Sequence, residues 1–100
     1  MALKTARFDV QDYLKTPEGR AAYLEAAFEE GSVETITLAL RDVARAVGMS
    51  EVARQAGITR EGLYKALSEK GDPRLSTVLG VARSLGINLS VRPDVGEEVR

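Results

Sequence analysis

Residues 49–68, MSEVARQAGITREGLYKALS, decide the fold of this 100-residue chain. A helix-turn-helix needs a small residue where its two helices cross, a residue tolerant of positive φ in the turn, and a bulky apolar residue that locks the crossing. Ala53, Gly57 and Leu63 meet these requirements at spacings of four and six residues. Ile58 adds an apolar anchor directly after the turn. The stretch therefore predicts two short helices that cross through a small-residue contact.

The second of these helices, expected at about residues 60–68, has a polar side that suits a groove of double-stranded DNA. With Leu63 buried, the helical period places the polar residues on the opposite face. Arginine and lysine recognise guanine, glutamate accepts a hydrogen bond from cytosine, and hydroxyl groups reach phosphates. Together with Thr59 as the expected N-cap, the candidate DNA-contacting residues of this helix are Thr59, Arg60, Glu61, Tyr64 and Lys65.

Both features also have a plainer interpretation. An αα-corner in a helical bundle uses a similar alanine and glycine for packing alone. The polar side chains would then be solvated surface, with an Arg60–Tyr64 or Glu61–Lys65 pair at i,i+4 spacing. Net charge does not separate the two interpretations, because the whole chain carries −1 and residues 49–70 carry four basic against three acidic residues.

Helix-start and helix-stop residues divide the flanking sequence and predict an all-α fold. Apolar residues recur at helical spacing between these signals. The signals are Thr16-Pro17 and Gly31 for one helix, Ser32 and Gly48 for the next, and Gly71-Asp72-Pro73 and Gly86 around a last helix at about 75–85.

After the last helix, the period changes to that of a strand. Ile87, Leu89 and Val91 alternate with polar residues. A single strand leaves its backbone groups unpaired, so it needs a mate. Within the chain the only candidate is residues 3–8; otherwise the mate belongs to a second copy or to another protein. We infer a homodimer.

Composition restricts the class of function. The chain has no cysteine and no histidine, which excludes disulfides, zinc fingers and thiol or imidazole catalysis. No apolar run approaches the roughly 18 residues of a membrane span and no signal-peptide pattern opens the chain, so we expect a cytoplasmic protein without a membrane partner. Carboxylate pairs such as Glu29-Glu30 and Glu97-Glu98 lack a ligand set or a tuned partner. We expect no enzyme, cofactor or metal site.

The flanking segments make the chain similar to one family. Residues 48–86, GMSEVARQAGITREGLYKALSEKGDPRLSTVLGVARSLG, resemble the Xre/Cro-type helix-turn-helix domain. With FDVQDYLKTPE (residues 8–18) and GDPRLSTVLGVARSLGINLSV (residues 71–91) added, the sequence resembles the addiction-module antidote proteins, the HigA-like antitoxins, over about residues 3–92.

This resemblance implies a five-helix, lambda-repressor-like DNA-binding domain with additions at both ends. The expected organisation is an N-terminal helical extension at 1–31, a helix-turn-helix domain at 32–92 that ends in the short β-strand, and a flexible tail at 93–100. It also implies a bacterial antitoxin, encoded beside a small basic toxin of the RelE/HigB type, which is often an mRNA-cleaving ribonuclease. Such antitoxins silence the toxin by direct binding and, as dimers, repress their own operon.

Carried over by position, the resemblance makes Arg60, Glu61 and Lys65 the groove-reading residues. One position departs from the pattern. Many Xre-type domains place a glutamine at the start of the first motif helix to hold a phosphate, and Met49 stands there. We expect Ser50, a shorter donor, to substitute for it.

Three functions stay open at this point. The first is an antitoxin with a DNA face and a separate toxin face. The second is a stand-alone Xre or phage-type repressor without a toxin. The third is an interaction module that has lost DNA readout, which the acidic pI and Met49 favour. For the first, opposite charge would attract a basic toxin to the acidic N-terminal portion, unless these acids are simply the solvated faces of two helices. The acids are Asp9, Asp12, Glu18, Glu25, Glu29 and Glu30.

Overall fold

The structure is a computed structural model and describes residues 10–94. All regular secondary structure in this range is helical, which confirms the predicted all-α class. The helices are α2 (Val10–Tyr13), α3 (Pro17–Glu30), α4 (Val33–Val47), α5 (Met49–Ala56), α6 (Arg60–Ala66) and α7 (Leu75–Ser84). Within the described range, no helix is both long enough and apolar enough to span a membrane.

Three helices begin where the sequence places a capping hydroxyl. The side chains of Thr16, Ser32 and Thr59 each accept a hydrogen bond from the backbone N–H three residues further on, at 2.8–3.1 Å. Each bond satisfies one of the N–H groups that the first turn of a helix leaves without an intrahelical partner. The starts of α3, α4 and α6 therefore follow from local chemistry.

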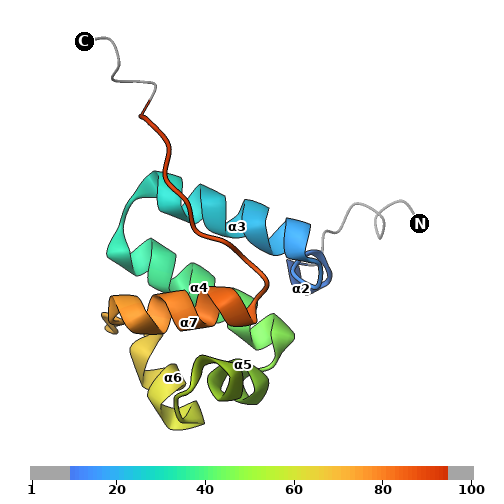
Figure 1. Ribbon diagram of the computed structural model, residues 1–100, viewed down its shortest axis with the longest axis vertical. Helices are drawn as coiled ribbons and strands as arrows, with labels where there is room; N and C mark the ends of the chain where they lie inside the picture. Colours follow the sequence, from blue (N-terminus) through green and yellow to red (C-terminus); the bar gives the residue numbers. More distant parts are fainter. Residues whose placement is uncertain (1–9, 95–100) are drawn as a thin grey trace.

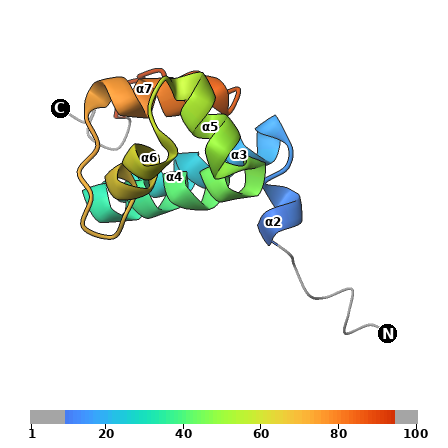
Figure 2. The ribbon, with the colours of Figure 1, turned by 90° about the horizontal axis from the view of Figure 1, so that it is seen from below.

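The helices form two groups that pack into one body, α3 with α4 and α5 with α6 and α7 (Figure 1). α3 and α4 run antiparallel and pack on one another, and α4 leads directly into α5. α5 packs against both α6 and α7. Figure 2 views the molecule from the side of α5 and α6, which lie at the end opposite α3.

Buried apolar side chains from both groups form one core. The predicted division of the chain at residue 31 stays a prediction, but side chains on both sides of it share this core, since Leu14 and Leu24 pack with residues from α4 to α7. The largest fully buried apolar side chains are Leu14, Leu40, Val43, Val52, Leu63, Leu67, Val81 and Leu85.

The guanidinium of Arg20 joins the segment before α3 to the end of α7. It donates to the carbonyl oxygens of Leu14 at 2.9 Å and Lys15 at 3.2 Å, just before α3, and to that of Leu85 at 3.1 Å, just after α7. Carbonyl groups at helix ends lack intrahelical partners, and one charged side chain here satisfies three of them.

Residues 87–94 form no strand, which corrects the expectation of a C-terminal strand within the described chain. A strand needs backbone hydrogen bonds to a mate, and residues 10–94 offer none, while the candidate mate 3–8 lies outside the described residues. The segment instead runs across α3 (Figure 1), where Arg92 pairs with Glu25 at 3.3 Å and Glu29 at 3.6 Å. Of the predicted tail at 93–100, only the first two residues are described.

Candidate functional site

The turn between α5 and α6 is closed by two backbone hydrogen bonds. The N–H of Ile58 donates to the carbonyl of Ala53 at 3.0 Å, and that of Gly57 donates to the carbonyl of Arg54 at 3.2 Å. This is the Schellman arrangement, which requires a left-handed residue after the helix. Gly57 supplies it with φ of +77°. The chain therefore changes direction within three residues, and α6 begins at Arg60.

The crossing of α5 and α6 places its small and its bulky residue in the core. Ala53 is 2% exposed and Leu63 is fully buried, while Ile58 is partly buried against the same cluster. α5 packs against both α6 and α7. The sequence analysis missed the close approach of α7: a Cβ added at Gly80 would lie 3.3–3.5 Å from atoms of Ala56, so the two helices lie in near contact there.

All the residues predicted to contact DNA are exposed. Within α6, the Arg60 guanidinium lies 5.1 Å from the centre of the Tyr64 ring, and its Nη2 is 3.4 Å from the Tyr64 hydroxyl. This is cation–π distance, and it is one of the two i,i+4 pairs that the plainer interpretation expects. The other does not form, since no ion pair joins Glu61 to Lys65 in the described part of the chain. The exposed set is Ser50, Thr59, Arg60, Glu61, Tyr64 and Lys65.

The exposed side of α5 carries an ion pair that sequence analysis did not single out. Glu51 accepts hydrogen bonds from Arg54 and from Gln55. The bond from Arg54, followed by that from Gln55, lowers the pKa of the Glu51 carboxyl, and the same bond raises the pKa of Arg54. Spacings of three and four residues were the signal that could have revealed it. Since Arg54 is offset by Glu51, the positive charge of the α5–α6 unit comes mainly from Arg60 and Lys65.

Met49 at the start of α5 is a core residue. Its side chain is 6% exposed and belongs to the apolar cluster, so it cannot offer a polar contact at the surface. Ser50, the next residue, is exposed. α5 has no side-chain cap, because Gly48 occupies the N-cap position. Ser50 therefore carries the first polar side chain of this helix.

The acidic N-terminal portion does not form one unpaired surface. Asp12 lies 3.6 Å from Lys15. Glu25 and Glu29 face Arg92 of the C-terminal segment. Asp9 lies outside the described residues. Of the predicted acidic set, this leaves Glu18 and Glu30 without an ion pair to any described residue.

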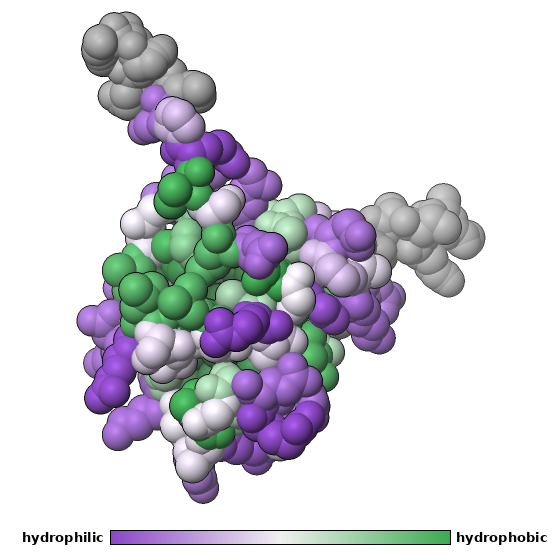
Figure 3. Space-filling model, viewed as in Figure 1, coloured by the Kyte–Doolittle hydropathy of each residue, from purple (hydrophilic) through white to green (hydrophobic). Residues whose placement is uncertain are grey.

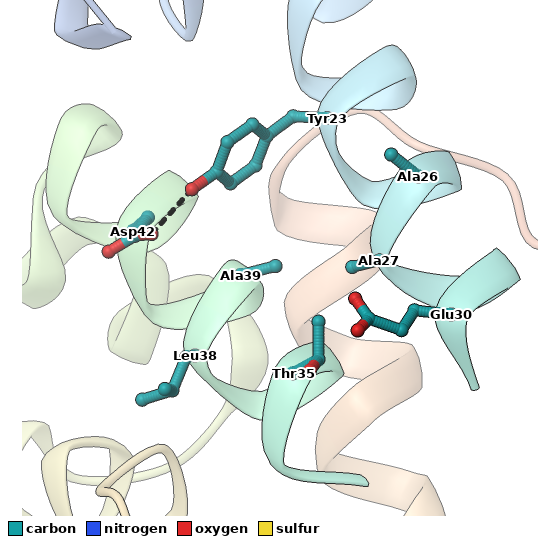
Figure 4. A pocket seen from close by; sticks show the side chains of 8 residues that line it. All are labelled: Tyr23, Ala26, Ala27, Glu30, Thr35, Leu38, Ala39 and Asp42. Atoms are coloured by element: carbon teal, nitrogen blue, oxygen red, sulfur yellow. Dashed lines mark hydrogen bonds between the residues drawn. The ribbon is translucent and has the colours of Figure 1, made fainter. Parts of the chain in front are cut away.

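Glu30 borders a groove between α3 and α4 of about 360 Å³ (Figure 4). The Tyr23 hydroxyl donates to Asp42 across it at 2.6 Å. That bond, with burial and the nearby charge, raises the pKa of Tyr23 to about 12. The groove has small apolar side chains, two carboxylates and no basic residue, which suits a basic amphipathic segment. Its lining residues are Tyr23, Ala26, Ala27, Glu30, Thr35, Leu38, Ala39 and Asp42.

Comparison with known proteins identifies a family that matches most of the chain. Residues 4–93 match the sequence model of a family described as "Probable addiction module antidote protein". A protein of Haemophilus influenzae (strain ATCC 51907 / DSM 11121 / KW20 / Rd), named "Uncharacterized protein", is 46% identical over 85 residues, which cover 85% of this chain and 88% of that protein. No solved structure matches the chain. The matched range includes every helix from α2 to α7.

Proposed function

Since the chain belongs to the family of addiction module antidote proteins, we propose that it is the antitoxin of a type II toxin–antitoxin module. It binds and neutralises a toxin of the RelE/HigB type, and as a dimer it represses its own operon through sequence-specific binding to operator DNA. Family membership supports a toxin partner in general. The α5–α6 unit supports DNA binding, and with α4 and α7 it is assigned to an Xre/Cro-like domain.

The DNA-binding proposal rests on one observation: the crossing of α5 and α6 is buried, while the polar side of α6 is exposed. Ala53 and Leu63 are buried at the crossing, whereas Arg60 and Lys65 lie on the outside of α6. In a helix-turn-helix, the first helix crosses the DNA backbone and the N-terminal residues of the second contact base edges in the major groove. Arg60 is at the first position of α6, where such contacts are made.

The residues of α6 divide between base reading and backbone contact. We assign Arg60 to guanine, Glu61 to the amino group of cytosine and Lys65 to guanine or phosphate. Tyr64 holds the Arg60 guanidinium over its ring and presents its hydroxyl to a phosphate or its ring to a thymine methyl. Ser50 at the start of α5 is the proposed phosphate donor of the first helix.

A gel shift with the DNA upstream of the gene tests this assignment. Lys65→Ala should weaken binding and reduce the steepness of the salt dependence by about one phosphate contact. Lys15→Ala is the matched control, because it removes the same charge from an exposed site between α2 and α3, away from α6. Equal binding by both variants would contradict the assignment.

The toxin is proposed to contact the groove between α3 and α4. The supporting observations are the carboxylates of Glu30 and Asp42 at the groove and the absence of a basic side chain among its lining residues. Opposite potentials speed the encounter and favour the correct partner. Deleting residues 1–31 is unsuitable as a test, because it would remove Leu14 and Leu24 from the core.

Co-purification with the product of the adjacent gene tests toxin binding. Glu30→Lys should weaken the complex at least tenfold, since it reverses a charge at the groove. Glu69→Lys makes the same change at an exposed site after α6 and should leave toxin affinity unchanged. If the adjacent gene encodes no small basic protein that co-purifies, the chain is instead a stand-alone repressor of the Xre type.

A further inference from the structure

The groove between α3 and α4 has a carboxylate at each end and small apolar side chains between them. Figure 4 shows Tyr23 and Asp42 at one end and Glu30 beside Thr35 at the other. Short side chains leave room for a further element to approach both helices closely. The small residues between the two ends are Ala26, Ala27 and Ala39.

The two carboxylates lie about two helical turns apart along the groove. On α3, Glu30 follows Tyr23 by seven residues. On α4, Asp42 follows Thr35 by seven residues. Because α3 and α4 run antiparallel, each of these pairs spans the groove from one end to the other. Seven residues of an α-helix rise by about 10 Å, so a ligand that reaches both carboxylates carries two cations about 10 Å apart.

One face of an α-helix has this spacing. Side chains seven residues apart lie on the same side of a helix, two turns apart, and the third and fourth residues after the first point the same way. In an extended chain, the side chains of one side recur at about 7 and 13 Å, so they do not match both carboxylates. Apolar side chains between the two cations would contact the alanines of the groove.

We propose that the α3–α4 groove binds an α-helix of the toxin whose docked face carries two basic residues seven positions apart, with apolar residues between them. One basic side chain pairs with Glu30 and the other with Asp42. The Tyr23 hydroxyl donates to Oδ2 of Asp42 and so orients this carboxylate, while its other oxygen can accept from the ligand. The identity of the partner rests on the proposed function, whereas the spacing follows from α3 and α4 alone.

Two other surfaces fit a basic helix less well. Glu25 and Glu29 of α3 already pair with Arg92. Figure 3 shows apolar side chains over the end of α3, the start of α4 and α7. Exposed side chains of these elements, such as Phe28 and Leu75, carry no charge that attracts a basic partner. All residues that line the groove come from α3 and α4, so an occupied groove leaves α6 available for DNA.

Two stapled helical peptides of the same composition test the spacing. In the first, two arginines are seven residues apart on one face with leucines between them; in the second, they are nine residues apart and lie on opposite faces. Amide chemical shifts of the isotope-labelled full chain report where each peptide binds. The first peptide should bind at least tenfold more tightly and shift the amides of Thr35 and Ala39. Equal affinities, or shifts confined to other elements, would overturn the proposal.

Ala26→Leu tests the shape of the groove, because it fills the groove without a change of charge. Ala26 is exposed, so folding is preserved. Ala21→Leu is the matched control, since it makes the same substitution at an exposed position of α3 that does not line the groove. The first peptide should bind Ala26→Leu at least tenfold more weakly than the wild type and Ala21→Leu unchanged. The same affinity for both variants would overturn the proposal.

A double-mutant cycle tests the two ion pairs. Replacing either arginine of the first peptide by glutamine should weaken binding to the wild type severalfold. In Glu30→Gln, loss of one of these arginines should have no further effect, and in Asp42→Asn the same should hold for the other arginine. If both arginines matter equally in both variants, the carboxylates do not hold the two basic residues and the proposal is wrong.

The toxin enters only the last comparison, so a failure of the proposed function can be told apart from a failure of the groove geometry. Toxin that co-purifies with Ala21→Leu and not with Ala26→Leu supports the proposal. Toxin retained by Ala26→Leu, while the first peptide still requires the open groove, would assign the groove to a helix of another partner. If Ala26→Leu instead converts a dimer into a monomer in sedimentation, a second copy occupies the groove and the proposal is overturned.

Discussion

The backbone N–H of Ile58 donates to the carbonyl oxygen of Ala53 at 3.0 Å, and this bond sets the direction in which the chain leaves α5. The same relationship closes α7, where Ile87 donates to Ala82 at 2.9 Å. In both places a left-handed glycine precedes an isoleucine that is partly buried against the core. One motif thus turns α5 into α6 and, at the end of α7, sends the C-terminal segment back toward α3.

The left-handed conformation at Gly57 should make this position intolerant of alanine. A Cβ there would meet nothing within 4 Å, so any loss is conformational. Gly57→Ala should lower the free energy of unfolding by about 1–2 kcal/mol, and Gly57→Asn by less, because asparagine tolerates positive φ better. Urea denaturation measures both. If the alanine variant is as stable as the asparagine variant, or more stable, the left-handed conformation at Gly57 does not limit this position.

Two arginines with long-range contacts should differ in their contribution to stability. Arg20 is partly buried and donates to three carbonyl oxygens, whereas Arg92 makes exposed ion pairs. Arg20→Met should cost about 2–3 kcal/mol, since it leaves those acceptors without a charged donor. Arg92→Met should cost less than about 1 kcal/mol of monomer stability, and salt should reduce that effect. If both variants lose the same unfolding free energy in thermal or urea unfolding, the proposed difference between Arg20 and Arg92 is wrong.

The hydrogen bond between Tyr23 and Asp42 should be visible in a pH titration. It raises the pKa of Tyr23 from 10.0 to about 12, because the protonated phenol is the donor. The bond therefore stabilises the fold fully below pH 10, and its contribution is lost as pH rises from 10 to 12. Ultraviolet titration of phenolate should show a late component near pH 12.

Asp42→Asn provides the control for that component. Without the carboxylate, the Tyr23 pKa should fall back toward 10.0 and the late component should disappear. The difference in unfolding free energy between the wild type and Tyr23→Phe should be about 1 kcal/mol at pH 8 and should shrink above pH 10. A titration curve that is identical in the wild type and Asp42→Asn would show that the bond does not control this ionisation.

Features fixed by neighbouring residues could be predicted from the sequence. The caps at Thr16, Ser32 and Thr59 act within three residues of their acceptors, so their patterns are visible in the chain. The left-handed turn at Gly57 and the burial of Leu63 follow from similarly short spacings. This is why the helix boundaries and the exposed side of α6 could be placed without coordinates.

Features that join distant segments could not be predicted. Arg20 and Leu85 are 65 residues apart, and Arg92 and Glu25 are 67 apart, so no local pattern links them. The alternation at 87–91 predicted a strand with a mate. In the structure the segment forms no strand, and Arg92 pairs with Glu25 of α3. The ion pairs of Arg92 divide the acidic surface. The groove between α3 and α4 arises from the packing of these two helices.

Arg60 provides the most direct test of whether the outer side of α6 reads DNA sequence. Fluorescence anisotropy should compare a duplex from the upstream promoter with a scrambled duplex of equal length, at one salt concentration. Wild type and Lys15→Ala should both prefer the promoter. Arg60→Ala should lose about 1–3 kcal/mol of that preference while keeping its weaker binding to the scrambled duplex. If Arg60→Ala discriminates between the duplexes as well as Lys15→Ala does, α6 is not the reading element.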